Sequence, residues 1–408
     1  MNTIRTLSID AIQKANSGHP GTPMALAPVA YTLWQDFLRF DPADPVWPNR
    51  DRFVLSAGHA SMLLYSMLFL TGVRAVDPDY EVVGEPAVSL DDIKQFRQLD
   101  SRAPGHPEYR WTSGVETTTG PLGQGVATSV GMAISSKWLG ARYNRPGAEL
   151  FDFDTYAIAG DGCLMEGVSH EAASIAGHLK LDNLCWIYDN NHITIDGRTN
   201  LTYEDDVATR FLGYGWNVTR VGDANDTDLV ARALGEFKAE PDRPTLIIVD
   251  SHIGYGSPHK QDTPEAHGEP LGEEEVRETK RAYDWPEDAQ FLVPDGVQQH
   301  FAERIGKRGA ELREAWEERL AAYAKDAPDL AAEVDAIQRR ELPGGWDAGI
   351  PSFEADEEKG LATRKASNKV QNAIAARLPW LLAGSADLTD STSVRLDLGE
   401  GNADEAGT

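Results

Sequence analysis

Two short groups of polar residues, Gly160-Asp161-Gly162 and Asn190-Asn191, each follow an apolar run that is typical of a buried strand. Residues 163–189 lie between them, which is enough for one helix and one return strand. In a parallel sheet, both groups then emerge at the same carboxyl edge, where α/β proteins bind ligands. A carboxylate and an amide oxygen at that edge, with a backbone oxygen near Ile193, suit Mg²⁺ or Ca²⁺.

A helix predicted to begin near Glu166 would direct its N-terminus at the same place and favour a bound diphosphate. Taken singly, Gly160-Asp161-Gly162 is most often only a turn, and Asn190-Asn191 only the end of a strand. Their joint spacing across one strand–helix–strand unit is what favours a functional site.

The elements that must position these residues alternate between strand and helix. In the middle of the chain we expect strands over 156–159, 184–188, 216–221 and 244–249, with helices over 168–179 and 228–237. The first third predicts helices over 4–15, 24–40 and 59–70 and a strand over 52–56, and 73–87 is interpreted as a loop or insertion. This pattern predicts an α/β fold in which helices cover both faces of a parallel sheet.

Composition excludes several classes of protein. Asp and Glu number 65 against 38 Lys and Arg, a formal net charge of −27, which disfavours binding to nucleic acid or to an anionic membrane surface. Two cysteines cannot form a disulfide scaffold and fit a reducing compartment, so we expect a cytoplasmic protein. No apolar stretch is long enough to span a membrane. An anionic ligand would need local arginines or a metal ion to offset the global charge.

Further motifs resemble those of the transketolase family, which is dependent on thiamin diphosphate. In family order they are Ser17-Gly18-His19-Pro20-Gly21, Leu55-Ser56-Ala57-Gly58-His59-Ala60-Ser61-Met62, Pro104-Gly105-His106-Pro107-Glu108, residues 114–125, Ile253-Gly254-Tyr255-Gly256-Ser257 and Gly384-Ser385-Ala386-Asp387-Leu388. The resemblance implies a diphosphate-binding domain over 1–325, a linker over 326–360, and the truncated start of a second α/β domain, the pyrimidine-binding domain, over 361–408.

The resemblance also implies roles for individual residues. The divalent metal, Mg²⁺ or alternatively Ca²⁺ or Mn²⁺, would be bound by Asp161, Asn191 and the carbonyl of Ile193. The implied thiamin diphosphate contacts are His59, Gly120, Leu122, Gly162, Asn191, His267 and Asp387. The implied catalytic residues are His19, His59, His106 and His267. The implied sugar-phosphate contacts are His19, His267, Arg364, Ser391 and, with less support, Arg97.

Some residues depart from the family pattern or allow two interpretations. Asp100, Thr263-Pro264 and the segment 388–391 stand where the family often has other residues, which places the sugar preference in question. Glu166 and Glu171 fit either a carboxylate network at a dimer interface or a solvated helix face.

The implied reaction is the transfer of a two-carbon ketol unit from a ketose phosphate to an aldose phosphate, in the pentose phosphate pathway. The resemblance implies that a homodimer carries it out.

Two alternatives to this function stay open. One is a sibling enzyme, either dihydroxyacetone synthase or, less well supported by the histidine motifs, deoxyxylulose phosphate synthase. The other is a non-catalytic cofactor-binding fragment, because the family chain continues beyond this one and carries there the glutamate that activates the cofactor.

Overall fold

The computed structural model describes residues 1–355 and 360–397, and the last residues of the predicted segment 361–408 lie outside this range. The chain divides into two compact units, Met1–Ala321 and Ala322–Thr408. The predicted site around Asp161 belongs to the first unit, and each unit is described by itself. Within the described residues, no helix is both long and apolar enough to cross a bilayer.

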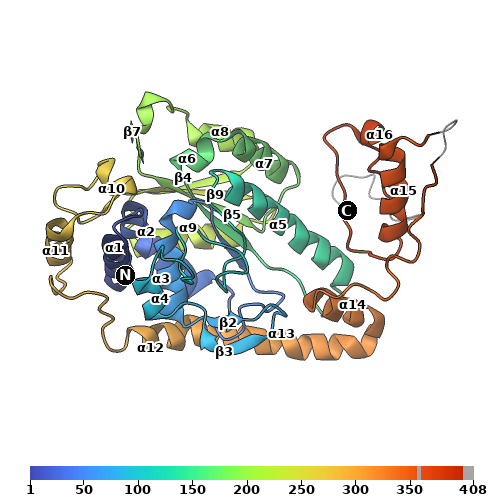
Figure 1. Ribbon diagram of the computed structural model, residues 1–408, viewed down its shortest axis with the longest axis horizontal. Helices are drawn as coiled ribbons and strands as arrows, with labels where there is room; N and C mark the ends of the chain where they lie inside the picture. Colours follow the sequence, from blue (N-terminus) through green and yellow to red (C-terminus); the bar gives the residue numbers. More distant parts are fainter. Residues whose placement is uncertain (356–359, 398–408) are drawn as a thin grey trace. The chain divides into compact units, whose positions relative to one another are not determined.

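A five-stranded parallel sheet forms the centre of the first unit (Figure 1). Its strands, in spatial order, are β1 (Arg52–Leu55), β4 (Thr155–Gly160), β5 (Leu184–Asn190), β9 (Thr245–Asp250) and β8 (Asn217–Val221). Because Gly160 pairs with Asp189, the carboxyl ends of β4 and β5 lie side by side. The sequence-based prediction that Asp161 and Asn191 follow neighbouring parallel strands is therefore confirmed.

Helices cover both faces of this sheet, as the alternation of strand and helix predicted (Figure 1). One face packs against α1 (Asn2–Ala15), α2 (Gly21–Thr32), α3 (Ser61–Thr71) and α9 (Thr227–Ala239). The other packs against α5 (Gln124–Tyr143), α7 (Gly167–His178) and α8 (Val207–Gly213). Successive β5 side chains alternate between the two cores: Ile187 joins the first, and Trp186 and Tyr188 join the second.

Three local features differ from expectation. The segment 73–87 is not simply a loop, because β2 (Arg74–Val76) and β3 (Val82–Pro86) form an antiparallel hairpin within it. The sequence Gly160-Asp161-Gly162 is not a turn: Gly160 ends β4, and α6 (Asp161–Met165) begins at the next residue. The long helix α5 was not predicted, since its run of small residues carries little apolar periodicity.

Smaller elements complete the first unit. They are the π-helix η1 (Leu33–Phe37), the 3₁₀ helices η2 (Gly58–Ala60) and η3 (Thr199–Leu201), α4 (Leu90–Lys94), the short pair β6 (Ile193–Thr194) and β7 (Gly197–Arg198), α10 (Glu265–Gly268), α11 (Glu273–Ala282), α12 (Val297–Phe301) and the π-helix η4 (Ala302–Gly306). The helix α13 (Lys307–Asp326) crosses the division between the units.

The described part of the second unit is helical. It contains α14 (Pro328–Gln338), α15 (Thr363–Ala375) and α16 (Thr389–Thr392), and no strand forms within residues 322–355 and 360–397. The first of these helices lies inside the predicted linker 326–360. The domain boundaries inferred from the sequence stay a prediction.

Candidate active site

A cavity of about 270 Å³ lies where β4 and β5 end. It collects most of the residues that the sequence singled out in the first unit. Its lining includes His19, His59, Gly120, Leu122, Asp161, Gly162, Asn191, Ile193 and His267. These residues come from segments spread between positions 19 and 267, so the fold, and not chain proximity, brings them together.

Asp161 provides a buried carboxylate at this cavity. Only 4% of the residue is exposed, and the hydroxyl of Tyr188 donates a hydrogen bond to Oδ1 at 2.5 Å. The other oxygen, Oδ2, is buried and has no hydrogen-bond partner within residues 1–355 and 360–397. Burial, followed by the nearby Asp189 carboxylate, raises the pKa of Asp161 to about 7, although the Tyr188 bond opposes the shift. A buried carboxylate oxygen without a partner requires a proton or a cation.

Asn191 and Ile193 add two further oxygen donors beside it. Asn191 Nδ2 donates to Asp189 Oδ2 at 2.8 Å, and Asn191 Oδ1 accepts a bond from the backbone N–H of Ile193 at 2.9 Å. This local bond folds the chain back after β5 and keeps Ile193 at the cavity wall. A carboxylate, an amide oxygen and a backbone carbonyl form the donor set that Mg²⁺ or Ca²⁺ prefers. The residues present therefore fit a divalent cation.

Three histidines form a cluster at the same cavity. The ring centroids of His19 and His59 are 5.1 Å apart, those of His59 and His267 are 5.0 Å apart, and those of His19 and His267 are 5.9 Å apart. Burial, with mutual repulsion as the second cause, lowers the pKa of His19 to about 4 and that of His59 well below its ordinary value. Burial also lowers the pKa of His267. The three rings are neutral at pH 7 and can each accept or donate one proton.

Two glycines allow the histidine loops to approach one another. A Cβ on Gly21 would lie 2.4 Å from Ile253 Cγ1 and 2.5 Å from the carbonyl oxygen of Ala266, the neighbour of His267. A Cβ on Gly58 would lie 2.9 Å from the backbone nitrogen of Gly120. The glycines beside His19 and His59 in the sequence motifs are thus explained by close backbone packing.

His106 and Arg97 lie next to this cluster but not in the cavity lining. A Cβ on Gly120 would come within 3.4 Å of the His106 ring. Both groups are close enough to help lower the pKa of His19. Arg97 donates to Ser17 Oγ at 2.6 Å, while its Nε is buried and finds no partner among the residues that the structure describes. The site therefore has a cation beside its histidines.

The remaining predicted residues belong to the second unit. Arg364 lies in α15 and Ser391 in α16, and both are exposed within that unit, as is Asp387. Their proposed contacts with substrate or cofactor stay predictions.

Sequence reasoning missed several residues of the cavity. Thr22, Asp189, Thr194 and Ile195 line it, and Tyr188 holds Asp161 from the adjacent strand. Strand alternation at the end of β5 was the available signal, because it places Tyr188 and Asp189 on opposite faces. A helix does begin near Glu166 as predicted, since α7 starts at Gly167 with Glu166 as its N-cap. The helix whose first residues line the cavity is α6, which starts at Asp161.

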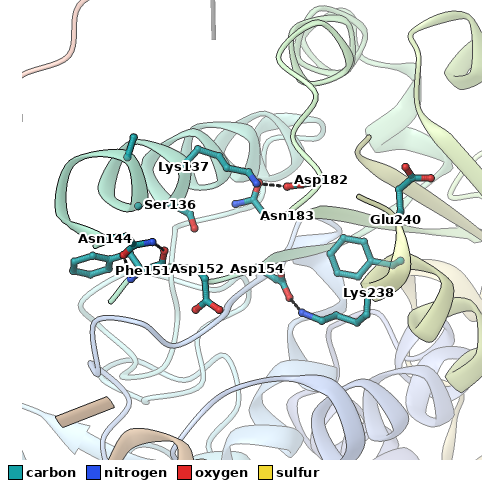
Figure 2. Close-up of a pocket in the computed structure, with 13 residues that line it drawn as sticks. Ser136, Lys137, Asn144, Phe151, Asp152, Asp154, Asp182, Asn183, Lys238 and Glu240 are labelled. Atoms are coloured by element: carbon teal, nitrogen blue, oxygen red, sulfur yellow. Dashed lines mark hydrogen bonds and ion pairs between the residues drawn. The ribbon is translucent and has the colours of Figure 1, made fainter. Parts of the chain in front are cut away.

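A larger cavity of about 430 Å³ lies at the opposite edge, where β4 and β5 begin (Figure 2). Figure 2 shows two ion pairs at this cavity, Lys137 with Asp182 and Lys238 with Asp154. Both lysines there are thus neutralised by aspartates. Ligands of parallel α/β sheets bind at the carboxyl ends of the strands, so the smaller cavity is the better candidate site.

Comparison with known proteins agrees with this choice. A family model described as "Transketolase, thiamine diphosphate binding domain" matches residues 1–343. The chain is 52% identical over 402 residues to transketolase from Geobacillus stearothermophilus, covering 98% of this chain and 58% of that protein. It is 47% identical to the chloroplastic transketolase-1 of Arabidopsis thaliana, covering 97% of this chain and 52% of that protein. The chain spans somewhat more than half the length of these relatives.

Solved structures give the same result. The transketolase of Leishmania mexicana superimposes with a TM-score of 0.89 at 42% identity, covering 97% of this chain and 57% of that one. A transketolase from Pichia stipitis in complex with sedoheptulose 7-phosphate gives the same TM-score and identity, covering 97% and 56%. Together with the cluster of Asp161, Asn191 and three histidines at the strand ends, these matches show that the chain belongs to the transketolase family.

Proposed function

We propose that the first unit binds thiamin diphosphate through a divalent cation, with Mg²⁺ as the expected ion. The observation that carries the proposal is the buried Oδ2 of Asp161, which has no partner among the described residues and belongs to a residue that lines the same cavity as Asn191 and Ile193. A cation there neutralises the carboxylate and can accept diphosphate oxygens in its remaining coordination positions. Gly120, Leu122 and Gly162 line the same cavity and would contact the cofactor.

When bound, thiamin diphosphate supplies an electron sink for carbon–carbon bond cleavage. The residues of this chain bind and orient the reactants and move protons. His19, His59 and His267 are held neutral by burial, so each can hydrogen-bond a sugar hydroxyl or transfer a proton to or from it. His106 lies beside Gly120 and is proposed to serve the same purpose.

The proposed activity of the complete protein is ketol transfer from a ketose phosphate to an aldose phosphate, as in the pentose phosphate pathway. Related structures from Pichia stipitis are described as complexes with sedoheptulose, fructose and xylulose phosphates. The net charge of −27 repels an anionic sugar phosphate, so local cations are needed to bind it. Arg97, which lies beside His19 and His106, is one such cation. Arg364 in the second unit is the other, and it is proposed to bind the sugar phosphate together with Ser391.

A homodimer in the cytoplasm is the expected form of the complete protein. The exposed face of α7 supports a protein interface, because Val168 is 42% exposed, Ile175 51% and Leu179, at its end, 37%. Exposed apolar side chains at this spacing share one side of the helix and are costly to leave in water. Glu171, also exposed, shares this helix.

Calorimetric titration of the 408-residue chain with thiamin diphosphate tests the cofactor proposal. Binding is expected with Mg²⁺ and not in the presence of a chelator, and the Asp161→Asn variant is expected to lose at least tenfold in affinity because a neutral amide binds a cation more weakly. The matched control is Asp182→Asn at the opposite edge of the sheet. A folded chain that binds the cofactor equally with and without metal contradicts the proposal.

An assay of ketol transfer should accompany the titration. Binding without turnover identifies the chain as a cofactor-binding part of the catalyst, whereas turnover by the chain alone shows that it suffices for catalysis.

A further inference from the structure

Asp189 is a buried carboxylate to which the proposed chemistry assigns no role. Only 1% of the residue is exposed, and it lies at the end of β5, where strand alternation turns it away from Tyr188 and towards α2. It accepts hydrogen bonds from the hydroxyl of Ser251, at the end of β9, and from Thr22 on α2. It also accepts a bond from Asn191 Nδ2 at 2.8 Å. Three separate segments are therefore joined at one carboxylate.

The bond to Asp189 is one of two hydrogen bonds that orient the Asn191 amide. An ionised carboxylate only accepts hydrogen bonds, so the amide must turn its NH₂ group towards Asp189. Its oxygen then faces the other way, where it accepts the bond from the N–H of Ile193 at 2.9 Å. Without an acceptor at position 189, the Ile193 N–H alone orients the amide, so the amide rotates more readily and can present its NH₂ group, which cannot bind a cation.

We propose that Asp189 is a positioning residue for the metal site, acting through Asn191. It fixes the orientation in which the amide oxygen of Asn191 is available to the cation. Through Thr22 it also anchors the start of α2, which follows the loop of His19, to the same point. The inference rests on the proposed function, since it presupposes that Asn191 is a metal ligand.

The adjacent residue provides an internal comparison. Asn190 Nδ2 donates to Asp250 Oδ1 at 2.7 Å, so two consecutive asparagines each bond to an aspartate. Of these two pairs, only Asn191 and Asp189 line the cavity. The sequence Asp189-Asn190-Asn191 does not reveal which pair serves the site, but the structure does. Removal of Asp250 thus breaks a similar asparagine–aspartate bond away from the cation, together with the ion pair of Asp250 with Arg220.

Three variants at position 189 separate positioning from general stability. Asp189→Ala removes the hydrogen-bond acceptor, and so does Asp189→Leu, whose side chain is similar in shape to that of aspartate. If one of these two variants does not fold, the other still provides the test. Asp189→Asn can keep an oxygen towards Asn191 and direct its NH₂ group at Ser251 and Thr22, whose hydroxyls can accept. The asparagine variant is therefore expected to restore what the alanine variant loses.

The experiment measures the affinity of the chain for Mn²⁺ in the presence of thiamin diphosphate, by calorimetry or by electron paramagnetic resonance. We expect a loss of 10- to 100-fold in Asp189→Ala or Asp189→Leu, the usual effect of removing a partner that orients a ligand, and a loss of less than about threefold in Asp189→Asn. Asp250→Ala is expected to stay within about threefold of the unsubstituted chain. Circular dichroism confirms that each variant compared is folded.

The outcomes separate a failure of the proposed cofactor binding from a failure of the role proposed for Asp189. Failure of the unsubstituted chain to bind Mn²⁺ contradicts the proposed function and this inference with it. Binding by the unsubstituted chain and equal binding by a folded Asp189→Ala or Asp189→Leu variant overturns this inference alone. Equal losses in Asp189→Ala and Asp250→Ala would also overturn it, because they would indicate a general structural effect.

Discussion

The hydroxyl of Tyr188 donates a 2.5 Å hydrogen bond to Oδ1 of Asp161, and the second oxygen of that carboxylate has no partner in the described part of the chain. The two residues come from adjacent strands, since Asp161 follows β4 and Tyr188 lies in β5. This hydrogen bond engages Oδ1 and restricts rotation of the carboxylate, so the position of Oδ2 is fixed as well. A cation at this site is therefore expected to bind one oxygen of Asp161, namely Oδ2.

Removal of this hydroxyl should weaken metal binding. In Tyr188→Phe, the carboxylate loses a donor that stabilises its charged form and can rotate, so we expect the affinity for Mg²⁺ with thiamin diphosphate to fall by about tenfold. Calorimetry measures the change. The control is Tyr156→Phe, which removes a tyrosine–aspartate contact of 3.5 Å to Asp154 at the other end of β4. Equal affinity in the two variants would show that the Tyr188 bond is unimportant.

The histidine cluster should make the fold sensitive to acid. The pKa of His19 is lowered to about 4, against about 6.5 in an unfolded chain. Between these values the unfolded state binds the proton and the folded state does not, so stability is present above pH 6.5 and is lost as the pH falls towards 4. His59, whose pKa burial also lowers well below its ordinary value, adds to the loss.

The His19→Asn variant should therefore show a shallower fall in unfolding free energy between pH 7 and pH 5. Urea denaturation at several pH values measures the slope, and each protein is compared with its own value at pH 8, where both states are unprotonated. A slope identical to that of the unsubstituted chain would contradict the assignment of a neutral, buried His19.

Two glycines in helices should respond oppositely to substitution by alanine. A Cβ on Gly177, in the last turn of α7, would lie 1.8 Å from the carbonyl oxygen of Tyr214, so the backbone must move. Gly177→Ala should cost about 1–3 kcal/mol or more. Gly131, inside α5, has open space at its Cβ, and Gly131→Ala should gain about 0.5–1 kcal/mol from lower backbone entropy in the unfolded chain. Urea unfolding compares the two, and similar effects of the same sign would refute the packing argument.

Much of the fold was predictable because apolar patterns are local. The strands β4, β5 and β9 are short apolar runs with polar ends, and their sequence positions alone indicated a parallel sheet. The hairpin within 73–87 was missed because its strands are largely exposed and are held mainly by backbone pairing, which leaves little periodicity in the side chains.

The site was only partly predictable for a different reason. Asp161 and Asn191 stand out because oxygen-bearing residues follow two strands at a suitable spacing. Tyr188 and Asp189 do not, since each looks like an ordinary strand residue until its hydrogen-bond partner is known. Roles that depend on contacts between distant segments, such as that of Asp189 with Thr22, require coordinates.

The direct junction between β4 and α6 has a further consequence. No loop separates Gly160 from Asp161, so the carboxylate is fixed to the sheet as rigidly as the strand itself. Inserting a single residue here would rotate the side chains of α6 by about 100° relative to the sheet, and there is no loop between β4 and α6 to take up the rotation. Loop-grafting and insertional engineering of this protein should consequently avoid that joint and use surface connections such as the tip of the β2–β3 hairpin.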